Sequence, residues 1–243
     1  MTAKELEKQF LKLLQRAGQR GKRLELVYTS RADGLTAYAG LFHDDRSVRL
    51  YYTDELLSAE SDELQAMLKH EVCHVITRPR SRVPRLCPED TAEFKAWNQF
   101  YSLSSEYEAH QEFQKRFDLD IPGLRTLNQK LFELGRKWID RALRNYLTLL
   151  GGSTIEDDEI LFPLFVELFQ FFEILLTADM TNDTRYMKLI EQEALVKLYE
   201  YYRWIKDLLE TVSKKKDYRE KVDELWRLFP IVHQLRVPQR QEF

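Results

Sequence analysis

The sequence predicts an α+β protein in which a small unit of helices and strands precedes an all-helical bundle. Three short segments between residues 24 and 53 are rich in Val, Tyr and Leu, which are common in strands. From residue 62 onwards, apolar residues recur at intervals of three and four, the period of a helix. Because no segment after residue 123 has a strand pattern, we predict domains at residues 1–120 and 121–243.

The composition is that of a folded protein with nearly balanced charge. Its 37 basic and 40 acidic residues give a formal net charge of −3, which predicts no general affinity for nucleic acid. The two cysteines, Cys73 and Cys87, are too few for a disulfide framework, and free thiols suit a reducing compartment. The first 23 residues lack the long apolar segment of a secretory signal. We therefore expect a cytoplasmic protein.

The N-terminal part combines one helix with a small sheet. Leu6 and Phe10 lie on one side of a helix predicted at residues 3–20. Two sequences rich in turn residues, 31–34 and 43–46, separate the strand-like segments that follow. The expected strands are residues 24–29, 36–42 and 47–53. Because short turns join consecutive strands, we predict a three-strand antiparallel meander.

All later elements are predicted to be helices. The helix that begins at residue 62 should end at Arg78, because a residue before proline is pushed out of the helical region. A loop rich in Pro and Arg then continues to Pro88. The helices expected after this loop are residues 89–100, 102–118, 124–150, 156–180, 184–213 and 218–236.

Residues 160–178 form the most apolar segment of the chain. Glu167, Gln170 and Glu173 recur at every third position and form one polar stripe along an otherwise apolar helix. A membrane-spanning helix would place both carboxylates in hydrocarbon, which is costly. We therefore predict a core helix and no membrane span.

A candidate metal motif, HEVCH, begins at His70. His70 and His74 lie one turn apart, about 40° from each other around the helix, so that both imidazoles can bind one zinc ion. Glu71 is close to this direction but displaced from it, which suits a general base acting on a zinc-bound water. The pattern therefore predicts a zinc-dependent hydrolase.

A catalytic zinc site needs a third protein ligand and an open position. Glu106 projects from the apolar face of its predicted helix, whereas Glu108 and Glu112 project away from it and are expected to be solvated. Glu106 is therefore the expected third ligand; the alternative for Glu106 is an ion pair with a nearby arginine. Asp90 is the rival ligand, although its position also suits the first turn of a helix.

His110 lies one turn after Glu106, on the same side of the helix. There it could orient a metal ligand or a bound substrate through a hydrogen bond. An equally good interpretation is a histidine at the edge of the core that is hydrogen-bonded to the backbone.

The order helix, three strands, HExxH helix and a helix with E-x-x-A, from Glu106 to Ala109, resembles the zincin-like gluzincins of minimal type. These include the minigluzincins and the ImmA/IrrE-type peptidases, and the second motif also resembles the glutamate helix of HtpX-type proteases. The resemblance implies zinc bound by His70, His74 and Glu106, with Glu71 as the base. It covers residues 20–118, and His110 stands where the family has an aspartate.

Residues 93–97 bear a weaker similarity to the SprT-like metallopeptidases, although Asp90 stands in place of their third histidine. We expect a zinc peptidase that acts on proteins or peptides. The alternatives are a non-catalytic interaction protein on the same scaffold and a DNA-associated SprT-like protease. Nucleic acid would then bind at the basic loop, which we otherwise interpret as solvated. Its arginines are Arg78, Arg80, Arg82 and Arg85.

Overall fold

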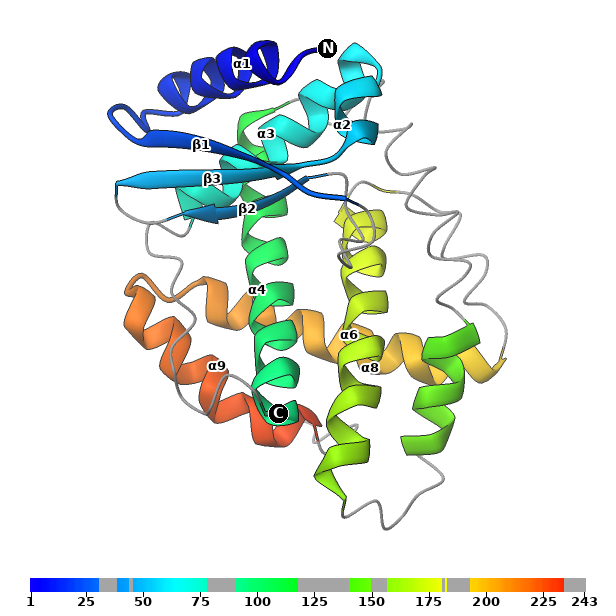
Figure 1. Cartoon of the computed structure of the whole chain (residues 1–243). Helices are drawn as coiled ribbons and strands as arrows, with labels where there is room; N and C mark the ends of the chain where they lie inside the picture. Colours follow the sequence, from blue (N-terminus) through cyan, green and yellow to red (C-terminus); the bar gives the residue numbers. More distant parts are fainter. Residues whose placement is uncertain are drawn as a thin grey trace. The chain divides into compact units, whose positions relative to one another are not determined.

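Figure 1 shows the computed structural model, in which each element keeps the label used below. The residues that it describes are 1–30, 39–43, 46–77, 91–117, 140–149, 157–180, 182 and 193–233. By their internal contacts they divide into two compact units. The sheet unit comprises Met1–Arg82 and Glu108–Gln129, and the helical unit comprises Val83–Tyr107 and Lys130–Phe243. The boundary predicted at residues 120 and 121 stays a prediction.

The sheet unit begins with helix α1, Ala3–Arg16. Thr2 caps it: its hydroxyl accepts a hydrogen bond from the Glu5 backbone N–H, while the Glu5 carboxylate accepts one from the Thr2 backbone N–H. This reciprocal arrangement satisfies backbone donors that a helix otherwise leaves unpaired. The buried face of α1 consists of Leu6, Phe10, Leu13 and Leu14. The N-terminal helix is therefore present, although shorter than predicted.

The sheet has three strands, as predicted, but is not antiparallel throughout. Strands β1 (Arg23–Tyr28), β2 (Ala39–His43) and β3 (Ser47–Tyr52) lie in the order β1-β3-β2. β2 and β3 are antiparallel, with Leu41 opposite Leu50, whereas β1 and β3 are parallel, with Leu26 opposite Leu50. The predicted meander is therefore wrong, because turn residues indicate where strands end and not which strand pairs with which.

Helices α2 (Asp54–Ser58) and α3 (Ser61–Thr77) follow the sheet, and α2 was not predicted. The sheet unit has one main core, to which α1, β3, α2 and α3 all contribute. Val48 and Leu50 supply its sheet side, with Arg49 between them on the opposite face, where it pairs with Glu25. Val72 and Val75 hold the motif-bearing part of α3 in this core. The HEVCH segment therefore lies on a helix, as predicted, and core packing anchors that helix.

Helix α4 spans Ala92–Arg116 as one continuous element, where two helices were expected. No proline or glycine interrupts the sequence between these residues, so the helical hydrogen bonds can continue through Ser102 and Ser104. Ser104 is buried within the helix. The chain passes from the helical unit to the sheet unit within α4, between Tyr107 and Glu108.

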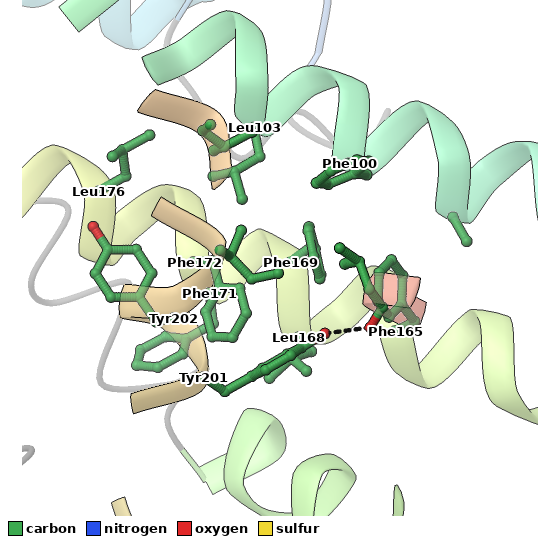
Figure 2. Close-up of a cluster of buried hydrophobic side chains, with 14 of the residues drawn as sticks. Phe100, Leu103, Phe165, Leu168, Phe169, Phe171, Phe172, Leu176, Tyr201 and Tyr202 are labelled. Carbon is green, nitrogen blue, oxygen red and sulfur yellow. Dashed lines mark hydrogen bonds between the residues drawn. The ribbon is translucent and has the colours of Figure 1, made fainter. Parts of the chain in front are cut away.

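The helices of the helical unit pack around a large core rich in aromatic side chains, part of which is shown in Figure 2. Phe165 and Phe169 stack with ring centroids 4.1 Å apart, and Phe100 meets Phe169 edge-on at 5.7 Å. Tyr201 enters the same core and donates a hydrogen bond of 2.6 Å to the backbone carbonyl of Val232. The helices of this unit are α6 (Asp158–Met180), α8 (Glu193–Ser213), α9 (Tyr218–His233) and residues 140–149, besides the first part of α4. Its described part is helical, as expected.

Helix α6 contains the apolar segment with the polar stripe. Glu167 accepts a hydrogen bond from Asn145 at 2.8 Å, and Glu173 accepts one from Gln99, also at 2.8 Å. Among the described residues, α6 is long and apolar enough to cross a membrane by length and composition, a test that the core helix of a soluble protein also passes. Both carboxylates accept hydrogen bonds from other side chains of the chain, which favours the interpretation of α6 as a core helix.

Candidate metal centre

The first half of the site lies on α3. The Nε2 atoms of His70 and His74 are 3.1 Å apart, and their ring centroids lie 4.8 Å apart with the planes at 86°. Two imidazoles bound to one tetrahedral zinc ion at about 2.0–2.1 Å would place their nitrogens about 3.3 Å apart. The pair therefore fits a shared ion with only a small adjustment. His74 is 8% exposed and Glu71 9%, so this side of the helix is largely shielded from water.

The second half lies on α4, where Glu106 and His110 are one turn apart on a single helix. The ring centroids of His70 and His110 are 4.7 Å apart. One ligand atom each from His70, Glu106 and His110 lies within 4.8 Å of the other two. Two nitrogens and a carboxylate oxygen at this separation are a donor set that suits zinc.

Small residues let α3 and α4 approach each other near these histidines. Ala66 and Cys73 of α3 form a separate buried cluster with Ala109 and Phe113 of α4. His70 lies between Ala66 and Cys73 at helical spacing, so it projects from the same side of α3. Because short side chains permit a close helix approach, the packing at this cluster explains why His70 meets α4.

Cys73 belongs to this packing and not to the metal group. It is fully buried, and burial raises the pKa of its thiol to about 12. A thiol that stays protonated is a poor metal ligand and a poor nucleophile. Cys73 therefore acts as a small apolar residue between two helices.

The prediction that Glu108 is a solvated surface acid is wrong. Glu108 is only 6% exposed, and the buried residues Tyr107, Ala109 and His110 adjoin it on α4. Because consecutive residues point in different directions, the helix is covered around most of its circumference at this level. Glu112 is also mostly covered, with a side chain 17% exposed, and pairs with Arg116. Apolar periodicity identifies only one inward face and misses such a fully packed turn.

Glu106 also influences a carboxyl group within the helical unit. Burial, and then the nearby charge of Glu106, raises the pKa of Glu173 from its usual 4.5 to about 8, although a hydrogen bond with Ser102 opposes this. Gln99 donates a further hydrogen bond to Glu173. Burial and the charge of Glu106 therefore both favour the protonated form of Glu173.

The structure therefore groups His110 with His70 and Glu106, and places His74 beside His70. The ligand set predicted from the sequence is His70, His74 and Glu106, with His110 not bound to the metal. This set stays a prediction. The i, i+4 spacing of Glu106 and His110 was the signal for this grouping, because it places both side chains on one face. Asp90, Cys87 and the four loop arginines lie outside the described residues.

A family model described as peptidase family M48 matches residues 1–82 of the chain. The matched part is about a third of the sequence and contains α1, the sheet and the HExxH helix, but not α4. The match supports a metallopeptidase, since M48 peptidases are generally metal-dependent. The chain matches no curated protein and no solved structure.

Proposed function

We propose that this chain is a zinc-dependent peptidase in which His70, His74 and Glu106 bind the metal and Glu71 is the general base. The convergence of ligand atoms from α3 and α4 is the observation that carries the proposal. An HExxH helix supplies the spacing that two imidazoles need, and the peptidase match over residues 1–82 supports the same chemistry.

A bound zinc ion supplies a Lewis acid that polarises a carbonyl group and acidifies water. Glu71 then accepts a proton from the attacking water at its carboxylate and delivers it to the nitrogen of the departing amine. Its place directly after His70 keeps this carboxylate beside the metal ligands, and its burial keeps it out of bulk solvent. Glu106 contributes a negative charge that balances part of the charge of the cation.

The proposed substrates are proteins or peptides, because a peptide bond contains a carbonyl group that a zinc ion held by these residues can polarise. The sequence resembles gluzincins of minimal type from residue 20 to residue 118, a more specific assignment that belongs to this proposal. The finer comparison with ImmA/IrrE-type peptidases rests on the order of helix, strands, HExxH helix and the helix with the Glu106 to Ala109 motif.

The experiment compares Glu71→Gln with Asp62→Asn, an exposed acid on the same helix. Both variants and the native chain are loaded with one equivalent of zinc and tested for chelator-sensitive cleavage of unfolded proteins. Glu71→Gln should retain zinc and lose cleavage by at least about a hundredfold, the usual contribution of a general base. Asp62→Asn should keep both.

Two outcomes would contradict the proposal. Full cleavage by Glu71→Gln would show that Glu71 is not the general base. Native protein that holds zinc but cleaves no protein or peptide, even after the chelated metal is restored, would indicate a non-catalytic metal-binding protein instead.

A further inference from the structure

We infer that His110 is a fourth protein ligand of the same metal ion, so that the resting site is closed by three imidazoles and one carboxylate. This inference rests on the proposed zinc site and concerns its coordination. It differs from the arrangement expected from the sequence, in which His110 orients a ligand through a hydrogen bond.

The first argument is the geometry of two helices. α3 offers His70 and His74, and α4 offers Glu106 and His110, so each helix presents two ligands at i, i+4 spacing. Side chains four apart on a helix have Cβ atoms about 5–6 Å apart and lie on one face. Two such pairs on facing helices can surround one ion, an arrangement that helix bundles use for metal sites.

The second argument is the distance of His110 from the other donors. Its nearest ring nitrogen is within 4.8 Å of a ligand atom of His70 and of a carboxylate oxygen of Glu106. The ring of His70 lies beside both other imidazoles, 4.8 Å from His74 and 4.7 Å from His110 between centroids. His110 therefore has a ring nitrogen close to a nitrogen and to a carboxylate oxygen at once, as a ligand of one shared ion would.

The third argument is burial. His110 is 7% exposed and His74 8% exposed, so both rings are removed from water to a similar extent. Adjoining Ala109 and nearby Phe113 pack against α3, which holds this turn of α4 beside the HEVCH segment. His110 therefore lies in the donor cluster on a turn of α4 that is packed against α3.

A fourth protein ligand changes what the site can do. Structural zinc sites have four protein ligands, whereas catalytic sites keep one position for water or substrate. With His110 bound, that position is filled until water or substrate displaces the imidazole, so the native chain cleaves slowly. Removing the imidazole should open the position, so His110→Ala should cleave faster than the native chain, whereas loss of a residue that orients a ligand should slow cleavage.

The test is X-ray absorption at the zinc edge on the full chain loaded with one equivalent of zinc, which counts imidazole ligands. The native chain should show three imidazoles, and His110→Ala should show two together with a water oxygen. The control is His233→Ala, which removes a histidine on α9 that contacts the backbone carbonyl of Phe229. This control should retain the native spectrum.

His110→Asn provides a second variant of more similar size, in case His110→Ala does not fold. Cobalt replaces zinc in both variants and in the native chain, and the visible absorption then reports the ligand set independently of cleavage. Each variant should change the cobalt spectrum, and His233→Ala should not.

Different results separate the inference from the proposed function. Two imidazoles and a water oxygen in the native chain, unchanged in His110→Ala, would overturn the role of His110 and leave the peptidase proposal standing. Failure of the native chain to bind zinc would overturn both. Slower cleavage by a zinc-loaded His110→Ala with an unchanged imidazole count would assign His110 to positioning alone.

Discussion

His70 and His110 face each other from two helices, with ring centroids 4.7 Å apart and ring planes inclined by 50°. The two residues are separated by forty positions in the sequence and belong to α3 and α4. Their proximity joins the HExxH helix to a second helix that also carries Glu106. The metal proposal depends on this relationship, because one helix alone supplies only two ligands.

Replacing Glu106 by alanine should strongly weaken zinc retention, because the metal would lose its only carboxylate ligand in the proposed set. Asp90→Ala should leave zinc retention unchanged. Metal analysis after dialysis of each purified variant, with circular dichroism to confirm folding, is the measurement. Loss of zinc from Asp90→Ala with retention by Glu106→Ala would assign the third ligand to Asp90.

Glu173 should make the stability of the metal-free chain depend on pH. Its pKa is raised to about 8 in the folded protein by burial and by Glu106. The contribution to the free energy of unfolding is therefore fully present below pH 4.5 and is lost as the pH rises towards 8. Urea unfolding across this range, with a chelator present, should show a flatter profile for Glu173→Gln than for the native chain.

The control for this experiment is Glu200→Gln, which alters an exposed acid on α8. Its profile should follow that of the native chain. If Glu173→Gln also follows the native profile, Glu173 does not titrate in this range.

Cys73 should resist thiol reagents in the folded protein, because its side chain is fully buried and its pKa is raised to about 12. The measurement uses Cys87→Ser, so that Cys73 is the only thiol left. At pH 8 a disulfide reagent should react with it slowly in native conditions and rapidly in denaturant. Equal rates in both conditions would show that α3 and α4 open readily at this contact.

Phe169 should contribute strongly to the stability of the helical unit. It is fully buried and contacts Phe100, Phe165 and Phe172 (Figure 2). Phe169→Ala should lower the free energy of unfolding by about 3–5 kcal/mol. Ile160→Ala on the same helix is the control, because that side chain is 52% exposed and should change stability by less than about 0.5 kcal/mol. Chemical denaturation followed by tryptophan fluorescence measures both, and equal effects would contradict the packing.

Features that depend on neighbouring residues were predictable from the sequence. The amphipathic pattern of α1, the strand segments and the HEVCH spacing all follow from periods of two or 3.6 residues. The continuous α4 was missed although no glycine or proline breaks it, because an apolar pattern that weakens around Ser102 and Ser104 resembles a helix end.

Local sequence patterns were enough to predict the HExxH helix, the position of Glu106 and His110 on one helix face, and the helices in the described part of the second half. Long-range packing places β1 parallel to β3, buries Glu108, and brings a ring nitrogen of His110 within 4.8 Å of ligand atoms of His70 and Glu106. The reason is that strand pairing and helix packing join residues far apart in the chain, whereas hydrophobic periodicity reports only which side of an element is covered.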